Sequence, residues 1–366
     1  MPRRWTVLLV VVWLASMIAG CGTPEPAASS LPAASPPPPS PTAGSVAADT
    51  AAAPPTSEPT TAPLLDATSA PSTESGEEEH PLYLSIIWHQ HQPVYFKDPD
   101  TGVYAKPWVR LHAAKDYVDM AAMLEQYPAI HATFNLTPSL IRQLDDLIAG
   151  ATDQYWLMAE VPADQLTDED KAFIRDRFFD TNPKVIARFP RYQQIAGDRE
   201  NSDGWDAGTW RDLQVLFNLA WTDPDWLEQE PLQALVAKGR DFAEEDKAII
   251  LAEHQRLVEE TIPVHQRLQE SGQIEVTMTP YAHPILPLLI DTSLARIAMP
   301  KADLPPRFSF PRDAVAQVER GVELYRQHFG VEPSGMWPAE GAVAQEMVGI
   351  AGRNGMAWMA SDEEVL

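Results

Sequence analysis

Two short motifs, far apart in the sequence, contain residue types that act on sugars. The first reads Trp-His-Gln-His-Gln-Pro and contains His89 and His91. The second reads Gly-Met-Trp-Pro-Ala-Glu-Gly, and in it the carboxylate of Glu340 follows Trp337 by three residues. A carboxylate can attack an anomeric carbon, imidazoles can hydrogen-bond to hydroxyl groups, and an indole can stack on a pyranose ring. Together the motifs indicate a carbohydrate-cleaving site.

The histidine pair has a second interpretation. Side chains two residues apart in an extended segment point to one side, which is also the arrangement of paired ligands in metal-dependent hydrolases and deacetylases. A zinc site needs a third ligand, for which Asp116, His112 and His283 are candidates, and none of them lies at a tight spacing. The sequence therefore favours a site without a metal or an organic cofactor. A metal-dependent polysaccharide deacetylase is the alternative.

Short apolar runs alternate with amphipathic segments from residue 81 onward. The apolar runs predict strands at residues 82–88, 130–136, 273–278, 334–337 and 356–360. The amphipathic segments predict helices at 114–125, 139–147, 241–270, 312–329 and 343–352, with Ser139 as a cap and Pro263 as an interruption. This alternation is typical of an α/β domain with parallel strands joined by helices. In a strand–helix barrel the reactive side chains lie at the carboxyl ends of strands, where both motifs fall.

One long segment, residues 155–240, departs from this alternation. It is rich in Asp and Pro, and it holds Trp156, Trp205, Trp210, Trp221 and Trp226. Indole rings stack on sugars, so the segment suits a sugar-binding rim. Tryptophan is also largely buried in most proteins, so the same residues equally suit the core of a helical subdomain.

The first 80 residues have the composition of a leader and a tether. Arg3 and Arg4 precede an apolar run, and small residues then lead to Cys21, the single cysteine of the chain. A lone cysteine makes no internal disulfide, and here it is typical of the lipid attachment site of a bacterial lipoprotein; an ordinary signal peptide with a chance cysteine is the alternative. Residues 22–80 have no aromatic side chain and many Pro, Ala, Ser and Thr residues, which predicts a disordered linker. The expected organisation is a signal peptide at 1–21, the linker at 22–80 and a folded portion at 81–366.

The charge of the chain restricts its partners. The formal net charge of the 366 residues is −25, from 52 acidic and 27 basic residues. An acidic surface repels nucleic acid and anionic lipid, so neither is expected as an electrostatic partner. We expect a neutral substrate, and contact with a membrane through a lipid at Cys21 alone.

Three segments, taken in order, resemble the first three sequence regions of glycoside hydrolase family 57. They are residues 88–93, 272–276 and 337–340. The connecting segments 107–112, 134–139 and 281–287 are similar as well, so the resemblance covers essentially all of 81–366. It implies an incomplete (β/α)7 barrel that carries the helical, aromatic-rich insertion. It also implies a retaining mechanism on α-glucans such as starch or glycogen, with α-1,4 and α-1,6 linkages as the candidate targets.

The resemblance also assigns roles to individual residues. It makes Glu340 the nucleophile, and it places His91, with His89 beside it, against the sugar hydroxyls. Glu275 is expected to orient the substrate or to bond to a neighbouring group, and Trp337 to provide a stacking face next to the nucleophile. Two further residues at strand ends, His283 and Asp362, are weaker candidates for substrate binding.

The sequence departs from the family pattern in one respect. In the family the general acid is an aspartate of a fourth region, well downstream of the third, and no such region follows Glu340 before Leu366. We therefore expect a barrel truncated at its C-terminus, with the acid lying downstream of Leu366. The leading interpretation is a secreted glycosidase, anchored as a lipoprotein to the outer face of a bacterial membrane. The alternative is a surface lipoprotein that binds glucan without cleaving it.

Overall fold

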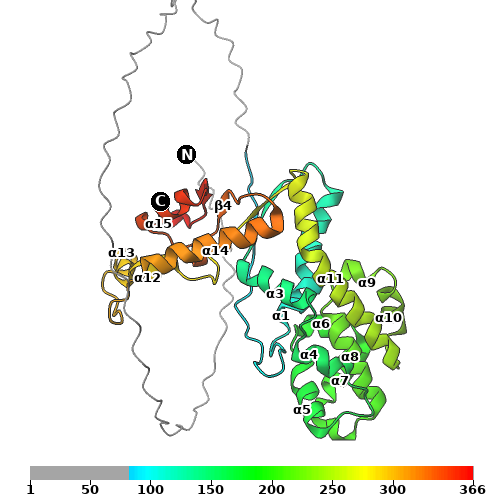
Figure 1. Cartoon of the computed structure of the whole chain (residues 1–366). Coiled ribbons are helices and arrows are strands. Elements are labelled where there is room, and N and C mark those ends of the chain that lie inside the picture. Colours follow the sequence, from blue (N-terminus) through cyan, green and yellow to red (C-terminus); the bar gives the residue numbers. More distant parts are fainter. Residues whose placement is uncertain (1–81, 366) are drawn as a thin grey trace, which may run out of the picture. The chain divides into compact units, whose positions relative to one another are not determined.

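The computed structural model describes residues 82–365 (Figure 1). The expected signal peptide, the linker and the lipidation site at Cys21 lie outside the described residues. Within 82–365, none of the helices has both the length and the apolar character needed to cross a bilayer.

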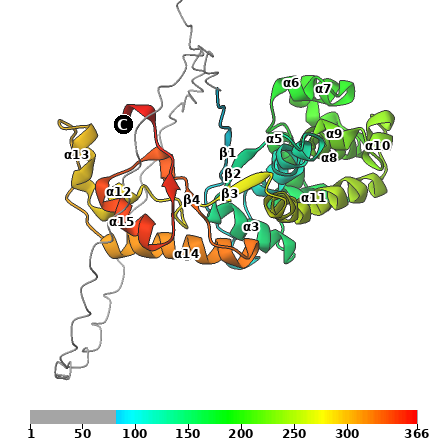
Figure 2. The ribbon, with the colours of Figure 1, turned by 90° about the horizontal axis from the view of Figure 1, so that it is seen from above.

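The strands of the domain are parallel and follow one another in chain order. Three of them form a sheet in the order β1-β2-β3, and the last two pair as β4-β5. A parallel bridge between Met278 and Met336 joins the end of β3 to β4, so the order continues from one sheet to the next. Figure 2 shows β1, β2 and β3 side by side. The strands are β1 (Ile87–Gln90), β2 (Ala132–Leu136), β3 (Ile274–Thr277), β4 (Gly335–Met336) and β5 (Trp358–Met359).

This sequential order is the order of a strand–helix barrel, since a doubly wound sheet reverses its strand order partway. The predicted α/β class with parallel strands is therefore confirmed. The expected seven-stranded barrel is represented by five strands between residues 82 and 365, two of them only two residues long.

The first predicted strand was wrong over most of its length. Leu82 and Leu84 were expected to be buried, but they are 97% and 83% exposed, and β1 begins at Ile87. The register explains the difference, because Ile87 pairs with Thr133 near the start of β2, and that strand begins only one residue earlier. An apolar run without a strand beside it has no face to bury.

Helices connect the strands and cover them. Helical segments run almost without a break from residue 108 to residue 126 between β1 and β2, and α3 follows β2. One apolar core unites β2, β3, α3, α14 and the second half of α11. The elements are α1 (Trp108–His112), the π-helix η1 (Ala113–Tyr117), α2 (Val118–Ala122), η2 (Met123–Gln126), α3 (Pro138–Ile148), α11 (Glu244–Glu270), α12 (Leu286–Ile290), η4 (Thr292–Leu294), α13 (Ala295–Ala298), α14 (Pro311–Phe329), η5 (Ala339–Gly341), α15 (Gln345–Arg353) and η6 (Glu363–Val365).

Two predicted helix details were wrong. The N-cap of α3 is Thr137, whose side chain accepts from the backbone N–H of Leu140, whereas Ser139 lies inside the helix. Pro138 occupies the first helical position, which Pro favours. Pro263 does not interrupt α11, which is continuous over 27 residues. The carbonyl that Pro263 leaves without a helical partner belongs to Glu259, and that residue is exposed to solvent.

Residues 154–238 form a helical subdomain with its own apolar core. Trp210 is buried in this core, while Trp156, Trp205, Trp221 and Trp226 pack partly buried against it. Of the two interpretations of this tryptophan-rich segment, the helical subdomain is therefore the one that the structure shows. Its elements are α4 (Gln154–Glu160), α5 (Asp168–Arg177), α6 (Pro183–Ile186), α7 (Pro190–Gly197), η3 (Arg199–Gly204), α8 (Ala207–Ala220), α9 (Pro224–Leu227) and α10 (Leu232–Lys238).

Candidate active site

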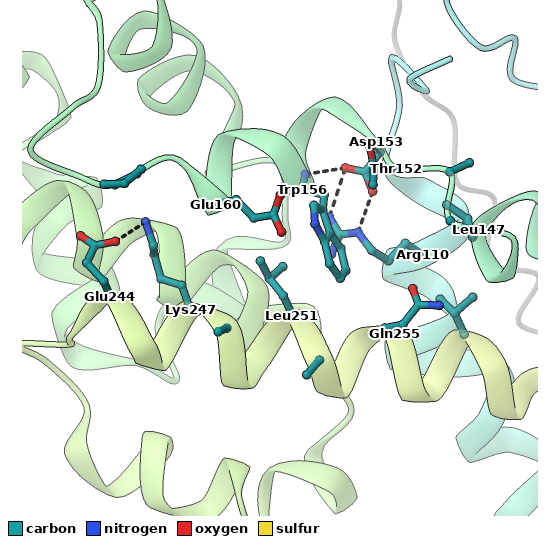
Figure 3. Close-up of a pocket in the computed structure, with 16 residues that line it drawn as sticks. Arg110, Leu147, Thr152, Asp153, Trp156, Glu160, Glu244, Lys247, Leu251 and Gln255 are labelled. Atoms are coloured by element: carbon teal, nitrogen blue, oxygen red, sulfur yellow. Dashed lines mark hydrogen bonds and ion pairs between the residues drawn. The ribbon is translucent and has the colours of Figure 1, made fainter. Parts of the chain in front are cut away.

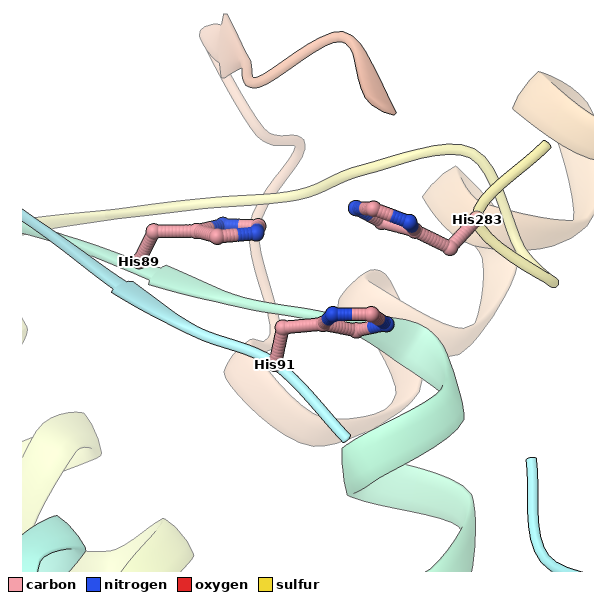
Figure 4. A group of neighbouring side chains, drawn as sticks. All are labelled: His89, His91 and His283. Carbon is pink, nitrogen blue, oxygen red and sulfur yellow. The ribbon is translucent and has the colours of Figure 1, made fainter. Parts of the chain in front are cut away.

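Three histidines meet at the carboxyl end of the parallel strands. His89 lies in β1 and His91 just after it, while His283 comes from the turn that follows β3. The rings of His91 and His283 stack with centroids 3.9 Å apart, and the ring of His89 lies 5.6 Å and 5.5 Å from them. Figure 4 shows the three rings facing one another. Residues nearly 200 positions apart thus form one cluster, here called the histidine cluster.

The second motif lies against this cluster. The indole of Trp337 stacks on His89 with centroids 5.1 Å apart. One carboxylate oxygen of Glu340, Oε1, lies 3.8 Å from Nδ1 of His283. The side chain of Glu340 is 67% exposed, whereas that of His283 is only 8% exposed. The arrangement therefore has a floor of imidazole and indole rings, of which His283 is the most covered, and an accessible carboxylate at its edge.

Left-handed backbone conformations fix two of these residues. Glu340 has φ 57° and His283 has φ 56°, which non-glycine residues adopt only at a cost of about 1–3 kcal/mol. Such strain is typical of functional positions, where the surrounding structure holds a side chain in one direction. Glu340 also lies outside α15, which starts at Gln345, so its carboxylate is not a first-turn residue of that helix.

Asn135 holds the ring of His89 and was not among the predicted site residues. Its Oδ1 lies 2.6 Å from Nδ1 of His89, and its Nδ2 donates to Oγ1 of Thr277 at 3.1 Å. An amide oxygen only accepts, so Nδ1 of His89 carries the proton and Nε2 keeps its lone pair. The three residues occupy matching positions on β1, β2 and β3. A signal was present in the sequence, because Asn135 lies next to the end of the strand predicted at 130–136, and His89 directly follows the strand predicted at 82–88.

Two rings of the cluster, those of His91 and His283, are uncharged near neutral pH. Burial, followed by the proximity of the other two imidazoles, lowers the pKa of His91 to about 4. Burial, followed by the proximity of His89, lowers the pKa of His283 to about 4 as well. Burial also lowers the pKa of His89, against the opposing effect of its bond to Asn135. The Nε2 atoms of His91 and His283 are buried and have no hydrogen-bond partner in the described part of the chain.

Two predicted site residues have other contacts. Glu275 lies two residues before Thr277 in β3, and its Oε1 accepts from Oγ of Ser334 at 2.5 Å and from Nε1 of Trp358 at 3.0 Å. It therefore ties β3 to the segments of β4 and β5. Asp362 accepts from the backbone N–H of Glu364, in a segment whose preceding residue, Ser361, donates to the carbonyl of Gly341.

The candidates for a third metal ligand separate into two places. His283 joins His89 and His91, with one ligand nitrogen from each within 4.8 Å of the others. His112 and Asp116 instead pair with each other, Nδ1 to Oδ2, at 2.6 Å.

A cavity of about 540 Å³ lies elsewhere, between α11 and α4, and it contains none of the predicted site residues (Figure 3). Its wall includes Arg110, whose guanidinium is buried against Asp153 at 2.6 Å and lies over the ring of Trp156. Arg110 also contacts Nδ1 of His254 at 2.7 Å. Because the guanidinium only donates, that nitrogen must accept, and burial followed by the Arg110 charge holds the pKa of His254 well below its usual range. We interpret this network as structural.

Comparisons with known proteins give three similar solved structures and one matching family. The fold is similar to an α-amylase of Thermotoga maritima, at 17% identity and a TM-score of 0.39, covering 75% of this chain and 38% of that one. It is also similar to branching enzymes of Thermococcus kodakaraensis, at 18% identity and a TM-score of 0.37 over 76% and 39% of the two chains, and of Pyrococcus horikoshii, at 14% and 0.36 over 76% and 41%. The chain thus spans about two fifths of the length of these structures. No curated protein matches its sequence. The model of the family described as glycosyl hydrolase family 57 matches residues 85–365, the whole described domain apart from its first three residues, and the chain therefore belongs to that family.

Proposed function

We propose that the protein is a retaining glycosidase that acts on α-glucans of the starch or glycogen type, with Glu340 as the nucleophile. The observation that carries this proposal is the exposed Glu340 carboxylate at the edge of a floor made by the histidine cluster and Trp337. A nucleophilic carboxylate must reach the anomeric carbon, and a sugar ring above an aromatic floor presents that carbon to the edge. Both α-1,4 and α-1,6 linkages are candidate targets.

The neutral histidines suit a neutral polyol. An uncharged imidazole offers one donor and one acceptor, so it can bind a hydroxyl group in either sense. The buried, unpartnered Nε2 atoms of His91 and His283 would gain hydrogen bonds from bound sugar hydroxyls. Asp362, beside the turn of Glu340, is proposed to contact substrate as well, and Glu275 to support the site through its bonds to Ser334 and Trp358.

Hydrolysis with retention requires a second carboxyl group, about 5–5.5 Å from the nucleophile, to protonate the leaving oxygen. Within residues 82–365, Glu340 is the acidic residue with an oxygen within 4.0 Å of a ring nitrogen of the histidine cluster. The proposed enzyme activity therefore depends on a general acid other than the groups of this cluster.

An α-glucosyl fluoride tests the nucleophile separately from the general acid. Fluoride leaves without protonation, so this substrate tests the nucleophile alone, whereas a maltooligosaccharide also needs the acid. We expect fluoride release by the full chain, and a fluorinated analogue that slows deglycosylation should label Glu340 in a peptide mass map. Glu340→Gln should reduce fluoride release by a factor of about 10³ or more. Glu346→Gln, at an exposed position on α15, is the matched control and should retain the rate. Unchanged release by Glu340→Gln would remove Glu340 from the nucleophile role.

A second candidate function is binding of glucan at the outer surface of a bacterial cell without cleavage. Among residues 82–365, Glu340 is the one acidic contact of the histidine cluster, and this favours it. It predicts retarded migration of the protein in gels that contain glycogen, with neither fluoride release nor cleavage of maltooligosaccharides. The lipoprotein anchor at Cys21 is a proposal common to both functions, and Cys21→Ser should release the protein from the membrane fraction.

A further inference from the structure

The cavity between α4 and α11 has the size and the lining of a ligand-binding pocket. Its volume of about 540 Å³ falls within the range of about 300–1,000 Å³ that small-molecule sites occupy. Most of its wall is apolar, and the residues of α11 that line it recur every three or four positions, so they occupy one face of that helix. Two of them, Ala248 and Ala252, are small and exposed, which leaves the cavity open to solvent along α11.

This cavity lies where two apolar cores meet. Leu147 and Val258 of its wall belong to the core of the strands, whereas Leu251 belongs to the core of the helical subdomain, against which Trp156 packs. Ligand sites occur preferentially at such junctions, since two units that each pack on their own core leave space between them. A molecule in the cavity would therefore contact both parts of the domain.

The buried cations in the wall are already paired. Each of the three guanidinium nitrogens of Arg110 donates to a buried acceptor of the protein, and Asp153 balances its charge. The ammonium group of Lys247 forms an ion pair with Glu244 at 2.6 Å and also donates to a backbone carbonyl and to a side-chain amide oxygen. Neither cation is left to attract an anionic ligand.

The wall instead offers hydrogen-bond acceptors. Among residues 82–365, Glu160 at the end of α4 has no ion-pair partner and accepts no side-chain hydrogen bond, and Figure 3 shows its carboxylate pointing into the space between the helices. Gln255 uses its side-chain N–H group to bind Glu259, so its Oε1 remains to accept. An apolar space with one unpaired carboxylate in its wall suits a ligand that combines an apolar body with one cationic donor.

We propose that this cavity binds a small organic cation, namely an apolar ring or chain that carries one ammonium group. The apolar body lies along α11 against Leu251, and the ammonium group donates to Glu160. The net charge of −25 adds to the preference, because it concentrates cations near the protein. None of the residues of the histidine cluster lines this cavity, so the proposal stands whether or not the protein cleaves glucans.

The test uses the full chain and 2-(2-naphthyl)ethylammonium, with 2-(2-naphthyl)ethanol and 3-(2-naphthyl)propionate as its neutral and anionic counterparts. Calorimetry at pH 7 should show one ammonium probe bound per chain. The alcohol should bind about 3–10-fold more weakly, since the carboxylate of Glu160 is exposed and its attraction is screened, and the propionate more weakly still. Glu160→Gln should weaken binding of the ammonium probe to the level of the alcohol. Glu245→Gln, at an exposed position of α11 outside the wall, is the matched control and should change nothing.

Ala252→Trp tests the cavity itself. Ala252 is exposed, so an indole at this position can fill the cavity without displacing the core, and binding of all three probes should fall at least 10-fold. Ala234→Trp, at an exposed position of α10 outside the wall, should leave binding unchanged. Thermal melting without probe establishes that each variant is folded.

Three results would overturn the proposal. They are the lack of saturable binding of the ammonium probe by the folded wild-type chain, undiminished binding by folded Ala252→Trp, and a preference for the ammonium probe over the alcohol that survives Glu160→Gln. Tighter binding of the propionate than of the ammonium probe would contradict the proposed charge of the ligand in the same way. Since no saccharide is present, failure here would not bear on the proposed hydrolysis.

Discussion

Mutation of Glu275 can distinguish a structural role of this residue from a contact with the substrate. Its Oε1 accepts hydrogen bonds from Ser334 and from the indole N–H of Trp358, so one carboxylate joins β3 to the segments of β4 and β5. We predict that Glu275→Ala destabilises the fold and leaves saccharide binding by the folded protein unchanged.

The size of the effect follows from these two bonds. A hydrogen bond to a charged group contributes about 1.5–3 kcal/mol. Both bonds of Glu275 are partly exposed to solvent, so each should contribute about 1.5 kcal/mol or less. Loss of both should cost about 2–3 kcal/mol, which lowers Tm by about 3–5 °C in a domain of this size. Glu275→Gln keeps an oxygen acceptor in the same place, so it should cost only about 1 kcal/mol.

Denaturant unfolding of Glu275→Ala, Trp358→Phe and the double variant measures the coupling directly. We expect a coupling free energy of about 1 kcal/mol, because Phe removes the indole donor and keeps most of the ring. Saccharide binding is then measured well below Tm. An unchanged Tm together with lost saccharide binding would refute the reasoning and assign Glu275 to the substrate instead.

Three further predictions concern stability. Gly335→Ala should destabilise the protein by about 1–3 kcal/mol in denaturant titrations, because a Cβ at this position would overlap the ring of Trp358. Stability should fall as the pH drops from 6.5 towards 4, because buried His265 has a pKa of about 4 in the folded protein, whereas in the unfolded chain it takes up a proton near pH 6.5. This residue should contribute about 3 kcal/mol of the loss. His265→Leu should remove that part of the pH dependence of the free energy of unfolding. Arg110→Met should cost about 3–5 kcal/mol, because it leaves the carboxylate of Asp153 buried without its partner, and adding Asp153→Asn should restore part of the loss.

The sequence predicted the position of the site better than its internal connections. His89, Trp337 and Glu340 were each assigned to the end of a strand, and parallel strands bring their carboxyl ends to one edge. The contact of His89 with Asn135 depends on the register of β1 and β2, which apolar periodicity does not specify residue by residue. The left-handed conformation of Glu340 could not be predicted either, because glutamate has no preference for positive φ.

The errors in the fold have a common physical cause. Leu82 and Leu84 have the alternation of a strand, but a strand needs a neighbour, and β2 does not extend to meet them. The tryptophans of residues 155–240 suited a sugar-binding rim and a helical core equally well, because the sequence does not show which surface packs against each indole ring. Thr137, by contrast, was within reach of the sequence, since it precedes a proline that favours the first position of a helix.

The exposure of the site restricts where a general acid can stand. His283 is almost wholly covered, while Glu340 is mostly open to solvent, so the proposed function requires a saccharide to approach from the side of the carboxylate. A second carboxyl group about 5–5.5 Å from Glu340 must therefore approach across the open edge, from a segment that covers the turn of residues 339–341, and not from the floor. A cross-linker of that reach placed on a cysteine introduced at residue 340 should capture the acid-bearing segment, and capture of a residue from β1, β2 or β3 instead would contradict this arrangement.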